Sequence, residues 1–332
     1  MFVPIISKEG KPLMPTTPSR ARRWIRSGKA TPFWSKGVFC VRLNLEPSDR
    51  ETQPIACGID PGSNKEGFVV KSEYHTFINI QADAVTHVKD AVKTRREMRR
   101  GRRNRKTPCR KNRRNRAKGS IPPSTKARWD WKLRICKWLS KLYPISLFVV
   151  EDIKARTTGK RKRDKSFSPL EVGKLWFYEQ IQKLGSVELR QGWQTKDLRD
   201  LHGLKKIGKK TANDWQAHCV DAFALAADVV GGFVPDNKSL VLLSPIRLHR
   251  RQLHRLQPEK GAIRKPYGST RSNGFKRGSL VKHIKYGFCY VGGMQKDRIS
   301  LHSLQDGKRM CQNAKPSDCQ FVCYLSWRST AP

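Results

Sequence analysis

The sequence is poor in acidic residues and has no long apolar stretch. Only 27 of its 332 residues are aspartate or glutamate, against 69 lysines and arginines, which leaves a formal net charge of +42. No run of about 18 apolar residues and no long amphipathic helix is present, so the sequence predicts neither a membrane-spanning nor a membrane-surface protein. A surface this positive repels itself unless phosphates compensate it. We therefore expect the partner to be a long nucleic acid.

The cysteines also lack a recognisable pattern. There are nine, at irregular spacing, and residues 1–5 do not form a basic leader followed by an apolar core. An odd number of cysteines without a leader predicts reduced thiols in a cytoplasmic protein. Cys311, Cys319 and Cys323 could be proposed as zinc ligands, but the paired Cys-x-x-Cys spacing is missing, so we do not favour a zinc site.

The opening of the chain predicts a small unit with a basic helix. Thr17 is the expected N-cap, with Pro18 at the first helical position. The helix that follows, residues 20–26, carries four arginines beside Trp24 and Ile25. One of its sides therefore suits an apolar contact and another suits phosphates.

The remaining elements follow from apolar periodicity and from turn signals. Strands are expected over residues 55–59, 67–70, 74–80 and 145–150, and helices over 82–106, 125–142, 169–184 and 213–230. The apolar residues of the helix over 125–142, namely Trp131, Ile135, Trp138, Leu139 and Leu142, are expected in the core rather than stacked on bases. From about residue 240, short strands and glycine turns predict a β-rich domain.

Three carboxylates lie on these elements, two of them at strand ends. Asp60 follows the strand over 55–59, Glu151 follows the strand over 145–150, and Asp221 lies on the helix over 213–230. This layout is that of an α/β fold of the RNase H-like nuclease type, in which distant carboxylates hold metal ions against a phosphodiester. Hydrolysis with two metals requires ions about 3.5–4 Å apart, and oxygen ligands with open positions select Mg²⁺ or Mn²⁺. We therefore expect Asp60, Glu151 and Asp221 to bind two Mg²⁺ ions, with Mn²⁺ able to substitute.

Two neighbours of these carboxylates leave alternatives open. Asp152 competes with Glu151, but adjacent residues on a strand point to opposite faces, so only one of the two can face the site. His218 lies three residues before Asp221 and is expected on the same helix face. It is either a catalytic base or phosphate partner, which we favour, or an ordinary helix histidine.

An arginine run between the first two carboxylates is the clearest nucleic-acid signal. Arg95, Arg96, Arg99, Arg100, Arg102, Arg103 and Arg105 cover all sides of a helix. Such a helix repels itself in water, whereas between phosphate backbones it is compensated on several sides. A disordered basic tail is the alternative, but this run lies in the middle of the chain.

These motifs together resemble a known family. The segments 12–15 (PLMP), 58–62 (GIDPG), 95–105, 149–151 (VVE) and 218–222 (HCVDA) are similar to those of the IscB and IsrB proteins, which insertion sequences encode. The family is related to the large CRISPR effector nuclease. The resemblance extends over nearly the whole chain, from the opening unit to the C-terminal domain.

One difference within that family favours IsrB. IscB proteins carry an HNH nuclease between the second and third RuvC motifs, whereas here only residues 152–220 separate them. That segment contains two histidines, His202 and His218, and the second belongs to the RuvC motif. The segment is too short, and too poor in ligands, for an HNH domain.

The resemblance implies a guided nickase. A protein of this kind binds a structured guide RNA (ωRNA), recognises a motif beside its double-stranded DNA target, opens an R-loop and cuts the non-target strand. Base pairing then carries most of the specificity. Asp60, Glu151 and Asp221 would hold the metal, and His218 would assist catalysis. The arginine run would be a bridge helix on the guide, and the β-rich domain would recognise the target-adjacent motif.

The nucleic-acid contacts that these roles imply can be named. RNA is expected at Arg20, Arg22, Arg23, Arg26, Arg95, Arg96, Arg99, Arg100, Arg102, Arg103, Arg105 and Lys106, and DNA at Arg264, Lys265, Lys276 and Arg277. We expect a monomeric ribonucleoprotein in the prokaryotic cytoplasm, associated with the nucleoid. The alternatives are a structure-selective resolvase that needs no guide and an RNA-guided DNA-binding protein that does not cut.

The expected architecture is a split nuclease core with additions. The parts are a PLMP unit (1–52), RuvC-I (53–82), the bridge helix (83–118), RuvC-II (119–165), RuvC-III (166–238) and the β-rich domain (239–332).

Overall fold

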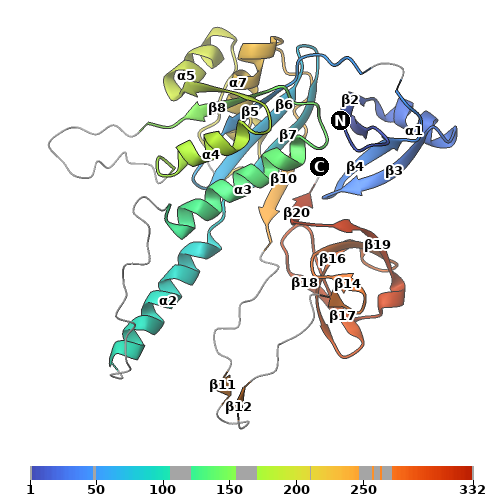
Figure 1. The fold of residues 1–332 in the computed structure, drawn as a ribbon, viewed down its shortest axis with the longest axis vertical. Helices are drawn as coiled ribbons and strands as arrows, with labels where there is room; N and C mark the ends of the chain where they lie inside the picture. Colours follow the sequence, from blue (N-terminus) through green and yellow to red (C-terminus); the bar gives the residue numbers. More distant parts are fainter. Residues whose placement is uncertain are drawn as a thin grey trace.

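The computed structural model shows a mixed α/β protein (Figure 1). It describes residues 2–47, 50–104, 121–154, 170–209, 211–246, 256–257, 262–263 and 271–330. None of the helices in these ranges is long and apolar enough to cross a membrane. The prediction of an α/β fold is confirmed.

A seven-stranded sheet forms the centre of the molecule. Its order is β20-β10-β7-β6-β5-β8-β9. The strands are β5 (Ala56–Asp60), β6 (Lys65–Lys71), β7 (Thr76–Asp83), β8 (Leu147–Asp152), β9 (Ser186–Gln191), β10 (Leu240–Pro245) and β20 (Trp327–Thr330). β5 pairs in parallel with β8, β8 with β9, and β7 with β10, whereas β6 is antiparallel to both of its neighbours. The carboxyl ends of β5, β7, β8, β9 and β10 therefore share one edge, which we call the carboxyl edge.

Helices cover both faces of this sheet. On one face lie α3 (Pro123–Leu139) and α4 (Lys174–Ile181), which contact each other. On the other lie α5 (Gly192–Leu201), α6 (Trp215–His218) and α7 (Val220–Val230), with α5 packed on α7. The five apolar residues that the sequence placed in the core are buried, Trp131 and Ile135 completely. Core packing, not base stacking, therefore explains the apolar stripe of α3.

The N-terminal unit is a four-stranded sheet with one helix. Its strands, in the order β2-β1-β4-β3, are β1 (Val3–Ile6), β2 (Pro12–Thr16), β3 (Ala30–Ser35) and β4 (Val38–Leu43). The helix α1 (Pro18–Arg26) buries Ala21 against this sheet, and the Thr17 hydroxyl accepts a hydrogen bond from the Arg20 amide (3.4 Å). The N-cap prediction is thus confirmed.

The C-terminal part consists of a five-stranded sheet and two short hairpins. The sheet, in the order β18-β17-β16-β15-β19, contains β15 (Ser279–His283), β16 (Gly287–Gln295), β17 (Arg298–His302), β18 (Arg309–Ala314) and β19 (Cys319–Tyr324), with the 3₁₀ helix η2 (Pro316–Asp318). The hairpins are β11 (Leu256–Gln257) with β12 (Ala262–Ile263), and β13 (Arg271–Ser272) with β14 (Phe275–Lys276).

The first and last strands of the C-terminal region do not belong to the separate β-rich domain that the sequence predicts. β10 and β20, expected in a separate β-rich domain from residue 239, are strands of the central sheet. The apolar residues Val241, Leu243 and Trp327 bury in the central core, which explains why these strands extend that sheet. A truncation near residue 240 would therefore remove two strands of the central sheet as well.

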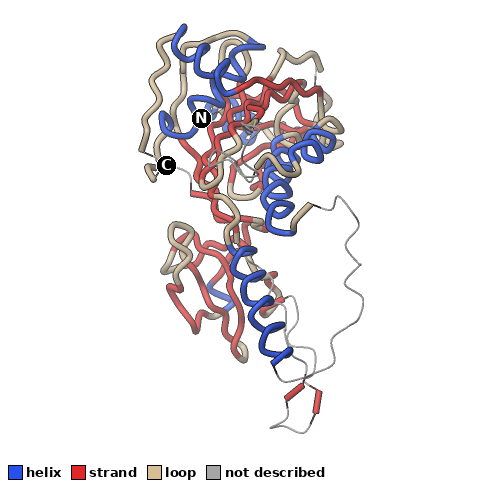
Figure 2. The backbone as a smooth tube through the Cα atoms, turned by 90° about the vertical axis from the view of Figure 1, so that its left-hand side faces the viewer, coloured by secondary structure: helices blue, strands red, loops and turns tan. Residues whose placement is uncertain are grey.

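The basic helix α2 (His87–Asn104) projects from the core (Figures 1 and 2). The prediction of a long helix here is confirmed over these residues. Arg95, Arg96, Arg99 and Arg100 are exposed along it. Arg102 and Arg103 belong to the helix, but their side chains, like Arg105 and Lys106 as a whole, lie outside the described residues.

Candidate metal centre

Two glycines allow the helices of one face to lie directly on the sheet. A Cβ added at Gly58 of β5 would lie 1.8 Å from the Ala222 carbonyl oxygen of α7. A Cβ added at Gly67 of β6 would lie 1.9 Å from the His218 carbonyl oxygen. Only glycine permits this approach, because a real Cβ cannot come so close to backbone. The first turn of α7 is thereby placed over the carboxyl edge.

The three predicted carboxylates meet at that edge. Asp60 ends β5, and the parallel register of Ile59 with Val150 places Glu151 of β8 beside it. Asp221 comes from the first turn of α7. One oxygen from each of the three carboxylates lies within 4.8 Å of the others. No other group of metal-ligating side chains gathers this closely in the described part of the chain, so Cys311, Cys319 and Cys323 do not form such a group.

Asp152 faces away from this cluster. Its carboxylate pairs with Lys174 of α4 (2.7 Å) and accepts hydrogen bonds from the Tyr178 hydroxyl (2.9 Å) and the Gln191 amide (3.1 Å). These contacts lie on the other side of β8 from Asp60. The alternation expected along this strand is therefore present, and Glu151 is the residue at the cluster.

Two cations approach the cluster from α5 and from the loop after it. The Arg199 guanidinium lies 2.7 Å from Asp221 Oδ1. The Lys206 ammonium contacts Asp221 Oδ2 and lies 4.0 Å from Asp60 Oδ2. On the β9 side, a Cβ at Gly192 would lie 3.2 Å from Glu151 Oε1. The Thr195 hydroxyl donates to the Gln191 carbonyl oxygen (3.4 Å), and the Thr195 side chain lowers the pKa of the Glu151 carboxyl. The carboxylates are thus held at close range by neutral and cationic donors.

Burial and mutual repulsion shift the pKa values of these carboxyl groups. Burial is the largest cause for Asp60, followed by the charges of Glu151 and Asp221; Lys206 opposes them, and the pKa rises to about 8. The pKa of Glu151 is also raised, by burial first and then by Asp221. The cluster retains a proton near neutral pH because the neighbouring cations do not fully offset the repulsion among its carboxylates. The cluster can therefore accept further positive charge. An all-oxygen donor set of this kind fits a hard divalent cation such as Mg²⁺.

The raised pKa of Asp60 predicts a pH-dependent stability without metal. The folded protein retains a proton that the unfolded chain releases above pH about 4, so the free energy of unfolding should fall as pH rises from about 4 towards 8. Urea unfolding in EDTA across this range measures the slope. Asp60→Asn should flatten it; an equal slope in both proteins would contradict the assignment.

The helix that carries His218 differs from the one expected. The helix predicted over 213–230 is two helices, since α6 ends at His218 and α7 begins at Val220, with Cys219 between them at φ −108° and ψ −15°. Helical hydrogen bonds still continue through the interruption, from the Cys219 amide to the Trp215 carbonyl oxygen and from the Phe223 amide to the Cys219 carbonyl oxygen (both 2.8 Å). The His218 side chain is buried, and its ring nitrogens are not among the atoms that gather with the three carboxylates.

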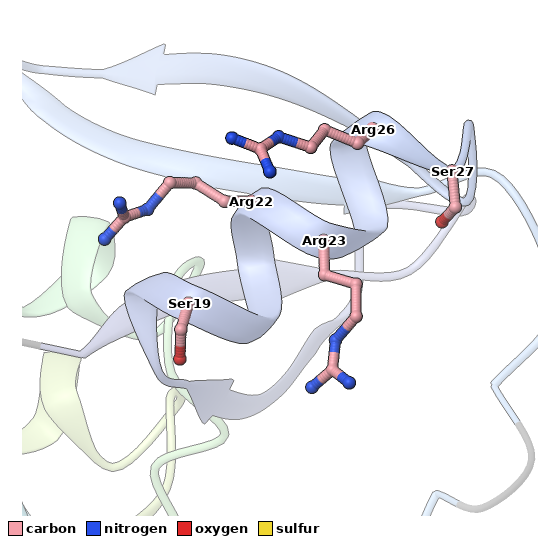
Figure 3. A pocket seen from close by; sticks show the side chains of 5 residues that line it. All are labelled: Ser19, Arg22, Arg23, Arg26 and Ser27. Carbon is pink, nitrogen blue, oxygen red and sulfur yellow. The ribbon is translucent and has the colours of Figure 1, made fainter.

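The basic residues of the N-terminal unit divide into two groups. Arg22, Arg23 and Arg26 line a surface hollow of about 650 Å³ along α1, together with Ser19 and Ser27 (Figure 3). Arg22 and Arg26 point to the same side of the helix. Arg20, in contrast, lies over the ring of Trp24, with its guanidinium carbon 5.9 Å from the ring centroid.

The predicted DNA contacts of the C-terminal part are only half described. Lys276 lies over the ring of Tyr324 (4.8 Å), and both Lys276 and Arg277 are exposed. Arg264 and Lys265 lie outside the described residues.

The sequence interpretation missed the groups that surround the carboxylates. Thr195 and Arg199 are four residues apart on α5, so a polar pair on the sheet-facing side of that short helix was the available signal. Lys206 gave no signal, because it lies in an irregular segment within a chain rich in lysine.

Comparison with known proteins gives matches among solved structures and one family model. The solved structure of T. thermophilus RuvC in complex with Holliday junction substrate is 14% identical, with a TM-score of 0.30, and covers 52% of this chain and 90% of that one. No curated protein matches. The family model described as RRXRR protein matches residues 3–165. The matched segment contains Asp60, Glu151 and α2, and over that half of the chain the sequence is similar to RRXRR proteins.

Proposed function

We propose that this protein is a metal-dependent endonuclease of the IscB type, in the IsrB-like form, which is guided by an ωRNA and nicks the non-target DNA strand. The observation that carries the nuclease assignment is the convergence of Asp60, Glu151 and Asp221 at the carboxyl edge. These residues come from two strands and a helix that are separated by up to 161 residues, so the fold has to bring them together.

The topology of the sheet supports an RNase H-like core. Strands β5 to β9 lie in the order 3-2-1-4-5 when they are counted along the chain, and only the second of them, β6, is antiparallel. The antiparallel opening, with carboxylates at the ends of the first and fourth strands, fits the RNase H-like layout. Asp60 and Glu151 occupy those two positions.

The site has the chemistry that phosphodiester hydrolysis requires. Divalent ions, when bound, activate the attacking water and stabilise the departing oxygen. Asp60, Glu151 and Asp221 would hold them, and Thr195 and Arg199 would keep Glu151 and Asp221 in position. His218 is assigned an auxiliary role by the motif alone.

Guidance by RNA rests on charge and on family similarity. The net charge of +42 exceeds what a few base contacts would need. The exposed arginines of α2 and the arginine-lined hollow of α1 offer two separate phosphate-binding surfaces. The RRXRR match over residues 3–165 supports an IscB-like protein. The short connection between Glu151 and Asp221, without room for an HNH domain, supports a nick over a double-strand break.

Cleavage of a supercoiled plasmid tests this function directly. Protein purified with its neighbouring non-coding RNA should nick the non-target strand in Mg²⁺, and omission of the RNA should abolish the nick. Cutting of branched DNA without RNA would instead identify a resolvase. Guided binding without any cut would identify a DNA-binding protein.

The arginines of α2 should contribute to RNA affinity through counterion release. Changing Arg95, Arg96, Arg99 and Arg100 together to glutamine removes four charges that should contact phosphates. The slope of log K against log salt should then fall by up to about 3 for single-stranded contacts. Filter binding of the ωRNA at several salt concentrations measures that slope. An unchanged slope would exclude α2 from the RNA interface. Changing Lys126, Lys137, Lys141 and Lys183 to glutamine removes the same charge from exposed positions outside α2 and is the control.

A further inference from the structure

A lysine side chain enters the space between two of the carboxylates. Lys206 lies in the irregular segment between α5 and α6, and its ammonium contacts Asp221 Oδ2 and lies 4.0 Å from Asp60 Oδ2. The side chain is 35% exposed, so it reaches the cluster from the solvent side. The groups that face it are Asp60 from β5, Glu151 from β8 and Asp221 from α7.

An ammonium at this position and a divalent ion exclude each other. Asp60 and Asp221 would hold a Mg²⁺ ion through carboxylate oxygens at about 2.0–2.1 Å. The Lys206 nitrogen contacts Asp221 Oδ2, so it would lie next to an ion held by that carboxylate, and both are positively charged. Arg199 differs, because it is held on the helix α5 and approaches the other oxygen, Asp221 Oδ1.

We propose that the Lys206 ammonium and a divalent ion compete for the space between Asp60 and Asp221, so that binding of the ion displaces Lys206. This inference rests on the metal site of the proposed function. Lysine suits the role, because its charge is compact and its four-carbon stem is flexible. We expect the Lys206 side chain and its exposed neighbours to move when the ion binds. The preceding residue Leu204 should stay in place, because it packs with Phe223 among the buried residues of the α7 face.

The competition gives Lys206 two opposite effects. Without metal, its charge offsets the repulsion among three carboxylates and stabilises the fold. With metal, the same charge must be moved, which weakens the observed affinity. Lys206 is thus a positioning residue that sets the metal concentration at which the site fills.

Titration of Mn²⁺ into the protein without nucleic acid tests the competition. Lys206→Met should bind Mn²⁺ at the cluster about ten-fold more tightly than the unmodified protein, because the competing charge is gone. Lys206→Arg retains a cation and should stay near the unmodified affinity. Lys205→Met is the matched control, since it removes the same charge from the adjacent, exposed residue and should leave the affinity within two-fold.

A second measurement separates competition from a general effect on folding. In EDTA, Lys206→Met should unfold at a lower temperature than Lys205→Met, and saturating Mn²⁺ should reverse that order. Equal Mn²⁺ affinity in Lys206→Met and Lys205→Met would overturn the proposal. If Asp60→Asn binds Mn²⁺ as well as the unmodified protein, the metal site itself, and with it the proposed function, is wrong.

Discussion

Replacing Asp60 by asparagine should reduce the rate of DNA cleavage by about 1,000-fold or more, while guide and target binding remain. The substitution keeps the size of the side chain but removes the charge that a metal ligand at the centre of the cluster must supply. Loss of one essential group typically removes most of the catalytic contribution of the whole set. Single-turnover nicking of a supercoiled target measures the rate, and gel-shift titration of the same complex measures binding.

Asp152→Asn is the matched control for this experiment. Asp152 is a carboxylate one residue from Glu151, but it pairs with Lys174 and Tyr178 on the opposite side of β8. We expect a loss of stability and a cleavage rate within a few-fold of the unmodified protein once the variant is folded. If Asp152→Asn loses cleavage and Asp60→Asn retains it, the face of β8 that carries the chemistry has been assigned wrongly.

Gly58→Ala should damage both the fold and the site. The added methyl would lie 1.8 Å from the Ala222 carbonyl oxygen and 3.0 Å from the Ala226 amide nitrogen, so α7 must move away from β5. Overpacking against backbone of this kind should cost roughly 3 kcal/mol of stability. A shift of α7 by about 1 Å carries Asp221 away from Asp60 and should lower cleavage a further hundred-fold. Chemical denaturation and single-turnover nicking measure the two effects.

Gly101→Ala provides the comparison for Gly58→Ala. An added Cβ at Gly101 of α2 meets nothing within 4 Å, and alanine favours the helix by about 0.5–1 kcal/mol. This variant should be as active as the unmodified protein. A Gly58→Ala protein with full stability and full cleavage would show that the close contact of α7 with β5 is not required.

The positions of the three carboxylates could be predicted because each lies on an element with a strong local signal, two at strand ends and Asp221 on a helix. Asp60 and Glu151 follow apolar strands, and the apolar stripe of α3 was correctly assigned to the core. The break between α6 and α7 could not be predicted, because the residues around Cys219 are compatible with a continuous helix. There, the His218 carbonyl lies directly over Gly67 of β6, a tertiary contact that no local pattern encodes.

Which strands belong to the central sheet could not be predicted from the sequence either. β10 and β20 have the same apolar character as the strands of the C-terminal sheet, and strand pattern alone does not say which partner a strand will choose. The choice follows from long-range packing: Trp327 lies edge-on to Trp131 (5.6 Å) and to Trp138 (5.2 Å) of α3. Lys206 was missed for a similar reason, since its role depends on a loop that no local pattern places at the carboxyl edge.

The place of β20 in the central sheet has a consequence for synthesis of the protein. Trp327 completes a cluster of tryptophans whose other members were made almost two hundred residues earlier. A chain still on the ribosome therefore exposes an unfinished sheet edge and an open core until residues 327–330 emerge. Closing so long a loop is slow relative to local folding. Chains that stop before residue 327 should consequently be substrates for proteolysis rather than partly active proteins.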